Sequence, residues 1–470
     1  MNDFASRASM RLASRPHPHP HAVRRAALAC MAAMAVALGV GRFAFTPLLP
    51  LMLHGGGLDL PHGGWLASLN YAGYFVGAVS CAALRIAPAK VVRASLAATV
   101  LLTIAMGVAH QFWIWGIVRF VGGIVSAWAF VYASQWGLRR LAELGAQPWS
   151  GVIYTGPGFG IVGTGLFVGV AGGFGASVGW IGFGVVSAVI VAVVWPVFGD
   201  GAAAIGSVAP GATNGPPSAA TANPSGTAMP GAAAGSAGAG AAFPAAHRSG
   251  SAALSHGAKD PQTKNLAKQA AAVPSRAQPV AHPNRADAFW LVLLYAIPGF
   301  GYIITATFLP VIARHALPGS AWPDLFWPMF GAALVVGALS AARLPLHWDN
   351  RSLLAACYVL QAAGIGLGIV WPTAAGFSLG SVLIGLPFTA ITLFEMREAR
   401  LLRGERAAGL MGYATAAYGV GQIAGPLVAA PLAASTGSFS PSLWLAAIAL
   451  VAGAVGLVWR VAVARGAVGR

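Results

Sequence analysis

The chain alternates long apolar runs with short polar connections from residue 26 to residue 463. About twelve runs of roughly 19 to 28 residues contain few charges, and each is long enough to cross a hydrocarbon core of about 30 Å as a helix. The pattern predicts an all-α membrane protein with twelve transmembrane helices. The predicted spans are 26–53, 63–87, 91–109, 112–138, 148–173, 178–198, 287–313, 322–343, 351–370, 372–396, 405–433 and 441–463.

The spans form two blocks of six that resemble one another. GVGRFAFTPLLP, residues 39–50, aligns with GFGYIITATFLP at an offset of 260 residues, so that Gly39 matches Gly299 and Pro50 matches Pro310. In the second spans, VGAVSCAAL aligns with VGALSAARL at the same offset. Two similar halves that start on one side of the membrane are parallel repeats related by an axis along the membrane normal. In transporters built this way, the substrate site lies between the halves near mid-membrane.

A segment rich in Ala, Gly, Pro and Ser, residues 200–286, separates the blocks. Its only aromatic residue is Phe243, so it cannot bury enough apolar surface to fold alone. We therefore predict a disordered cytoplasmic tail over 1–25, a six-helix bundle over 26–199, a disordered cytoplasmic linker over 200–286, a second six-helix bundle over 287–463 and a cytoplasmic tail over 464–470.

The distribution of charge sets the expected orientation. The chain is 57% hydrophobic and 8% charged, which excludes a large soluble protein with a mixed-charge surface. All but three of the 28 Lys and Arg residues fall in the termini or in every second connection, so the net charge of +17 does not indicate nucleic acid as a partner. By the positive-inside rule, that side is the cytoplasm and holds both termini. Arg greatly outnumbers Lys, as in GC-rich bacterial genomes, so we expect a multi-pass protein of the bacterial inner membrane.

Reactive groups are sparse where chemistry would need them. The three Cys residues lie in or beside spans, and no disulfide framework or metal-ligand spacing occurs. The His residues lie in tails, loops or span ends, without an acidic partner at matching depth, so we predict no enzyme activity, catalytic residue, metal or cofactor. No phosphate-binding Gly-Lys-Ser/Thr loop is present, which argues against direct use of ATP by this chain.

Two arginines lie inside predicted spans. Arg42 lies 17 residues after Arg25 and 12 before His54, deep in the first span, and Arg119 lies nearer the outer face in the fourth. A central charge costs roughly 2.5 to 3.5 kcal/mol on insertion scales, so it should face a partner or a watery cavity. All Asp and Glu residues are expected in loops, tails or span ends, with Glu395 at the cytoplasmic end of the tenth span. Each arginine therefore either bonds helix carbonyls and locks the packing or binds an anionic ligand.

Helical spacing supplies neighbours for these arginines. Asn70 and Tyr74 share one face of the second span, Tyr418 and Gln422 lie one turn apart on the eleventh, and Tyr302 is the repeat mate of Arg42. Such residues either line a binding site or only hydrogen-bond a neighbouring helix. The candidate substrate-binding residues are Arg42, Asn70, Tyr74, Arg119, Tyr302, Tyr418 and Gln422.

Several motifs resemble the major facilitator superfamily (MFS). IVRFVGGIVSA matches its fourth-helix Arg-x-x-x-Gly motif at Arg119 and Gly123, and YTGPGFGIVGTG is loosely similar to its Gly-Pro helix motif. In the loop between spans 2 and 3, Cys81 replaces the usual Asp, a departure that affects the inter-helix charge lock. GVGRFAFTPLLPLM followed by GWLASLNYAGYFVGA resembles the YbfB/YjiJ subfamily. The resemblance implies the MFS fold but no substrate. Organophosphate antiporters of the superfamily use an arginine in each half, whereas here Tyr302 occupies the second position, which disfavours a highly charged phosphate.

Together these features predict a secondary active transporter of a small organic solute, anionic or carboxylate-bearing, that works by alternating access. The expected environment is the lipid bilayer and the expected state is a monomer; whether an ion is coupled stays open. Efflux of hydrophobic or drug-like compounds is an alternative, because the spans are rich in aromatic residues. A membrane sensor on a transporter scaffold is a further alternative, with residues 200–286 as its natural signalling part.

Overall fold

The computed structural model describes residues 20–199 and 285–468, apart from 56, 82, 85, 346, 405 and 406. Every regular element in these ranges is a helix. Eleven helical segments among them are long and apolar enough to cross a membrane. The remaining span is the second one, α4 (Leu60–Ser80). It has 21 residues, but polar groups such as Asn70 lower its mean hydropathy. The prediction of an all-α protein with twelve membrane-spanning helices is confirmed.

The spans are arranged as two sets of six. In the first half they are α2, η1 and α3 together (Pro20–Met34, Ala35–Val40 and Phe45–His54), α4, α5 (Pro88–Val108), α6 (Phe112–Glu143), α7 with α8 (Ser150–Ile153 and Gly156–Ala171) and α9 (Ala176–Val194). In the second half they are α11 (Arg285–Ala316), α12 (Pro323–Ala341), α13 (Asn350–Val370), α14 with α15 (Ala374–Gly385 and Phe388–Arg403), α16 (Ala407–Thr436) and α17 (Ser440–Val468). Short 3₁₀ turns, η2 (Gln147–Trp149), η3 (Gly172–Phe174) and η4 (Trp195–Phe198), lie at the ends of α7, α8 and α9.

Several helices continue beyond the predicted spans. α2 begins at Pro20, inside the predicted tail over 1–25, and α17 runs to Val468, past the predicted end at 463. α15 reaches Arg403, although the predicted tenth span ends at 396. Hydropathy marks where a helix leaves the hydrocarbon rather than where its hydrogen bonds stop. Most of the linker predicted over 200–286 lies outside the described residues, and its last two residues begin α11.

Polar caps mark the starts of several spans. At α4, the amide of His62 donates to Asp59 Oδ1 at 2.8 Å, and at α14 the amide of Gly376 donates to Thr373 Oγ1 at 3.3 Å. Asp349 caps α13 in the same way. These side chains accept the first amide hydrogens, which have no partner inside the helix. The backbone hydrogen bond from His62 also lowers the pKa of the Asp59 carboxyl in the connection ahead of α4.

The two halves repeat one close helix contact. A Cβ atom added to Gly123 of α6 would lie 2.1 Å from the backbone oxygen of Asn70, and one added to Gly385 of α14 would lie 2.4 Å from the backbone oxygen of Phe330. Each contact joins the second and the fourth span of its own half, α4 with α6 and α12 with α14. Small residues let membrane helices approach this closely. The packing therefore carries the internal repeat expected from the sequence.

We expect Gly123→Ala to destabilise the protein, whereas Gly122→Ala, one residue earlier, should be tolerated. The new methyl group at 123 would meet backbone atoms of Asn70, which yield only if the helices separate, and overpacking of this kind costs about 1 to 3 kcal/mol. A Cβ on Gly122 would lie 3.7 Å from Asn70 Nδ2, an ordinary contact. Melting temperatures of the two variants in detergent measure the difference, and equal values would contradict the close contact.

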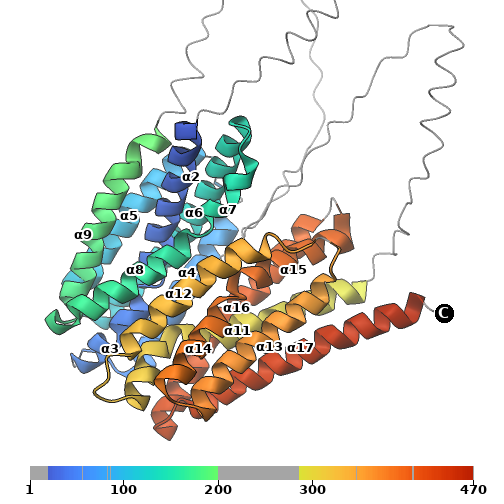
Figure 1. Ribbon diagram of the computed structural model, residues 1–470. Coiled ribbons are helices and arrows are strands. Elements are labelled where there is room, and N and C mark those ends of the chain that lie inside the picture. The colour runs from blue at the N-terminus through green and yellow to red at the C-terminus, as the bar shows by residue number, and fades with distance from the viewer. Residues whose placement is uncertain are drawn as a thin grey trace, which may run out of the picture.

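The bundles meet through the helices nearest their common centre. α4 packs on α16, α8 packs on α12, and α3 also contacts α11. Figure 1 shows the bundles together at the end of the molecule that holds α3 and α14, and spread apart toward the end that holds α2, α15 and the C-terminus. A site between the halves is therefore bordered by the first span, α4, α11 and α16.

Candidate functional site

Arg42 lies at a break in the first span. The π-helical turn η1 interrupts the helix between α2 and α3. The amide of Gly41 donates to the carbonyl of Val36, five residues back, at 2.9 Å. Such turns change the direction of the side chains that follow and are frequent at functional sites. The break places Arg42 in the middle of the span, at the boundary between the two halves.

The side chain of Arg42 bridges the halves. It is 3% exposed, and its Nη2 donates to Gln422 Oε1 at 2.9 Å. Gln422 Nε2 in turn donates to the hydroxyl of Tyr302. The guanidinium carbon lies 4.2 Å from the ring centroid of Tyr74 and 5.0 Å from that of Tyr71. A cation over an aromatic face gains about 0.5 to 2 kcal/mol. These groups orient the guanidinium at the contact between the halves.

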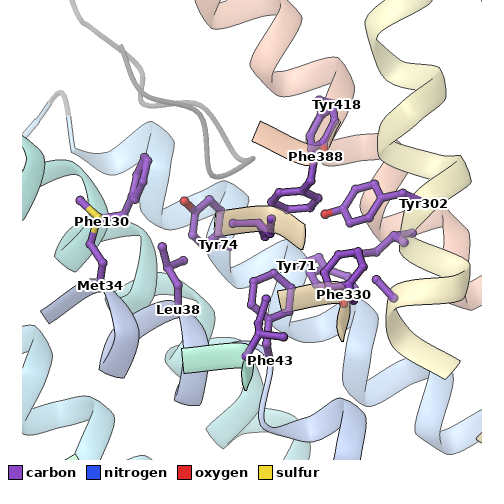
Figure 2. Packing of buried hydrophobic residues seen from close by; sticks show 14 of the residues in the cluster. Met34, Leu38, Phe43, Tyr71, Tyr74, Phe130, Tyr302, Phe330, Phe388 and Tyr418 are labelled. Atoms are coloured by element: carbon purple, nitrogen blue, oxygen red, sulfur yellow. The ribbon is translucent and has the colours of Figure 1, made fainter. Parts of the chain in front are cut away.

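Aromatic rings of the second half line the junction, the place between the halves where Arg42 meets Gln422. The rings of Tyr302 and Tyr418 are nearly parallel, with centroids 6.0 Å apart, and Tyr418 stacks on Tyr295 at 4.9 Å. Phe388 of α15 meets Tyr302 edge to face at 4.9 Å. Figure 2 shows Tyr302, Phe388 and Tyr418 gathered opposite Tyr74 of the first half. The junction therefore joins one cation to a wall of flat apolar surfaces.

Arg119 is engaged inside the first half. Its guanidinium, 3% exposed, donates to backbone carbonyls of the first span and α4. The bonds are Nε to Leu66 O at 3.4 Å, Nη1 to Gly41 O at 3.5 Å and to Arg42 O at 3.4 Å, and Nη2 to Arg42 O at 3.3 Å. Asn70 Nδ2 donates to the carbonyl of Arg119 at 2.8 Å. Buried carbonyls need donors, so Arg119 holds the backbone that carries Arg42, and Asn70 ties α4 to α6 at the carbonyl of Arg119.

More hydrogen bonds join the halves beyond Arg42, on the side away from the termini. Thr46 Oγ1 donates to Ala306 O at 2.9 Å, Ser68 Oγ donates to Ile423 O at 2.8 Å, and the hydroxyls of Tyr71 and Thr307 lie 3.1 Å apart. The bundles spread at the opposite end (Figure 1). The halves are thus held together on the side of α3 and separate on the side of the termini.

The structure brings most of the predicted residues together. Arg42, Tyr74, Tyr302, Tyr418 and Gln422 meet at the junction. Asn70 and Arg119 instead bond each other within the first half, behind Arg42.

Two residues at the junction, Tyr71 and Phe388, were not predicted from the sequence. Tyr71 contacts both Arg42 and Thr307, and Phe388 packs on Tyr302. Tyr71 could have been found, because it precedes Tyr74 by three residues and so lies close to it on the helix surface. Phe388 has no such signal, because nothing in the sequence distinguishes it from the many aromatic residues that face lipid.

Glu395, the acidic residue expected at the cytoplasmic end of the tenth span, is enclosed by protein in the structure. Glu395 lies within α15 and is 0% exposed. The predicted span ends at 396, and its apparent end placed Glu395 at the membrane surface. Because α15 continues to Arg403, Glu395 is enclosed by the second bundle. Glu398, one turn further on, is 5% exposed.

A match to a protein-family model shows which family the chain belongs to. A family model described as an uncharacterised MFS-type transporter, YbfB, matches residues 34–223 and 251–458. The chain belongs to this YbfB family of MFS transporters. The resemblance seen in the sequence motifs is confirmed, and the protein is a multi-pass membrane transporter with a small-molecule substrate.

Individual proteins similar to this YbfB-family transporter say little about its substrate. A chloramphenicol resistance protein of Streptomyces lividans is 34% identical over 180 residues, in an alignment that covers 34% of this chain and 42% of that protein. The matched part is therefore less than half of the relative. A crystal structure of a mutant of the nucleoside transporter NupG aligns with a TM-score of 0.64 and 11% identity, over 92% of this chain and 99% of that one. At this identity the likeness supports the MFS fold alone.

Proposed function

We propose that this transporter carries a small organic solute with one carboxylate across the bacterial inner membrane by alternating access, with both termini in the cytoplasm. The bridge from Arg42 to Gln422 carries the proposal. It places a fixed positive charge between two halves that rock against one another in this architecture. In this orientation, the bonds near α3 close the periplasmic side and the site faces the cytoplasm.

The ligand's carboxylate would take the place of Gln422 Oε1 at the guanidinium. Arginine can hold a carboxylate through two parallel hydrogen bonds, which are stronger than a bond to a neutral amide. Gln422 and Tyr302, released from the bridge, would then turn to other polar groups of the solute. The body of the solute would pack on the rings of Tyr302 and Tyr418. Binding would therefore exchange a contact between the halves for contacts to the ligand.

Within this proposal, Asn70 and Arg119 are positioning residues rather than ligand contacts. The bonds of Arg119 fix the backbone at the break from which Arg42 projects, and Asn70 in turn fixes the backbone of Arg119. They act on the solute only through the orientation of that side chain.

Efflux of neutral, hydrophobic compounds is the second candidate. The aromatic wall around Tyr302 favours it, since flat apolar molecules stack on such rings without an ionic contact. The name of the Streptomyces relative points in the same direction. In that case Arg42 would serve only to hold the two halves together.

Two ligands that differ only in charge separate these functions. Benzoate and benzamide have nearly the same shape, but only benzoate carries a carboxylate. We expect benzoate to raise the melting temperature of the purified full-length protein, and benzamide and chloramphenicol to raise it less or not at all. A shift with chloramphenicol and benzamide but not with benzoate would reject the anion site and support efflux.

A further inference from the structure

Glu395 of α15 is a carboxyl group enclosed by the second bundle. Its side chain is 0% exposed, and within the described part of the chain neither carboxylate oxygen has a hydrogen-bond partner. An ionised carboxylate buried without partners is strongly disfavoured, and such a group takes up a proton instead. In the observed conformation Glu395 is therefore a neutral carboxylic acid.

Among the described residues, no arginine or lysine is hydrogen-bonded to the carboxylate of Glu395. On α15 itself the facing ionisable group is Glu398. Tyr295 of α11 and Tyr358 of α13 are the electrostatic neighbours from those helices. From α16, Tyr418 lies one ring further away, stacked on Tyr295. The charged residue of α12 is Asp324, which pairs with Arg314 near the opposite end of the bundle.

The fold does not require an acid at this position. Aligning the equivalent contacts at Gly385 and Gly123 places Glu395 on Ala133 of α6. Ala133 is fully buried in the first bundle, which has the same architecture. Because an alanine fills the matching position, helix packing alone does not explain why the second bundle contains a buried carboxyl.

An ionic network lies between Glu395 and the membrane surface at the end of the termini. Glu398 Oε1 accepts a hydrogen bond from Arg351 Nε at 2.6 Å, and Arg351 Nη2 lies 3.5 Å from Asp287 Oδ2. Arg460 also pairs with Asp287. Glu398 is one helical turn from Glu395, so it offers a proton acceptor between the buried carboxyl and the polar surface.

A line of polar and aromatic contacts leads from Glu395 toward the site. Thr392, one turn earlier on α15, accepts a hydrogen bond from the hydroxyl of Tyr295 at 3.0 Å. Tyr295 stacks on Tyr418, and Tyr418 lies over Tyr302. Tyr302 is joined through Gln422 to Arg42. A change in the charge of Glu395 therefore acts on the same rings that border the proposed ligand.

We propose that Glu395 is the proton-binding site of this transporter, so that the coupling ion is a proton. Glu395 accepts a proton at its carboxylate to become the neutral acid that its enclosed position favours, and returns it to water by way of Glu398 when rocking of the halves exposes it. The proposal rests on the transport function proposed above, since it names the ion coupled to the solute.

Infrared spectroscopy of the full-length protein in lipid tests this without any ligand. The carbonyl stretch of a protonated carboxylic acid is separate from that of a carboxylate. We expect the wild type to show this band at neutral pH, to lose it reversibly at alkaline pH and to shift it in D₂O. Glu395→Gln should remove the band, whereas the matched control Glu143→Gln, at an exposed carboxyl paired with Arg139, should retain it.

Stability separates a proton site from a structural one. Glu395→Met replaces the carboxyl by an apolar chain of similar length and should melt at or above the wild-type temperature, because no bond is lost. Absence of the band, its survival in Glu395→Gln, or failure to exchange with D₂O would overturn the proposal, as would unfolding of both variants. The outcome is independent of benzoate binding, so it can fail while the anion site stands, and the reverse.

Discussion

Replacing Arg42 by Gln is expected to abolish the preference of the transporter for benzoate over benzamide. Losing one partner of a buried, hydrogen-bonded charge pair costs about 2 to 5 kcal/mol, which corresponds to a loss of affinity of about 30-fold or more. Gln retains hydrogen-bonding groups that can meet Gln422, so the halves stay bridged. The melting-temperature shift and a calorimetric Kd for benzoate measure the effect, and affinity for benzamide should change little.

Two further substitutions show whether charge or geometry matters at this position. Arg42→Lys keeps the positive charge but lacks the planar fork, so we expect benzoate affinity between those of the wild type and Arg42→Gln. Arg93→Gln removes an arginine of the same half whose side chain bonds Trp195 O at 2.9 Å, away from the junction, and should bind benzoate as the wild type does. An unchanged preference for benzoate in Arg42→Gln would contradict the anion site.

The fold could be predicted from the sequence because hydropathy and length identify most of the segments that cross a bilayer. Eleven spans pass both criteria, and the position of α4 in the internal repeat identifies the twelfth. The same repeat pairs Arg42 with Tyr302, and in the structure these two residues reach Gln422 from opposite halves. The symmetry between the repeats therefore predicts that Arg42 and Tyr302 lie near the centre of the molecule, where the two halves meet.

The partners within that centre lie beyond what a sequence pattern records. Arg42 and Gln422 are 380 positions apart, and their bond depends on how two bundles dock. Arg119 donates to backbone carbonyls, which every residue possesses, so no residue type indicates its partners. The burial of Glu395 could not be predicted, because hydropathy does not record which helices enclose a side chain.

The asymmetry between the halves is the feature that most narrows the function. The first half contributes the cation of Arg42 at the junction, and the second contributes Tyr302, Tyr418 and the enclosed carboxyl of Glu395. Rocking of two equivalent bundles would need none of these differences, since helix packing is shared by both. In the proposed cycle, Arg42 of the first half holds the solute and Glu395 of the second half holds the proton, so each half has a separate role.

Arg119→Met is expected to cause the largest loss of stability. The substitution keeps an apolar chain of similar length but leaves the carbonyls of Leu66, Gly41 and Arg42 without the donors that Arg119 supplies. A buried polar group left without a partner costs about 1 to 3 kcal/mol, so we expect a loss of about 3 kcal/mol or more. Melting temperature and the yield of monodisperse protein in detergent measure this loss.

Rescue by lysine distinguishes a positioning role from packing alone. Arg119→Lys restores a cation and part of the hydrogen bonding, so we expect it to recover some of the melting temperature and, with it, the benzoate shift that depends on Arg42. The matched control is Arg314→Met, which breaks a partly exposed pair with Asp324 and should cost little stability and leave the benzoate shift intact. If Arg119→Met were as stable as the wild type, the hydrogen bonds from Arg119 to these carbonyls would not stabilise the protein. If benzoate raised the melting temperature of that variant as much as that of the wild type, Arg42 would be held in place by Gln422 and its aromatic neighbours alone.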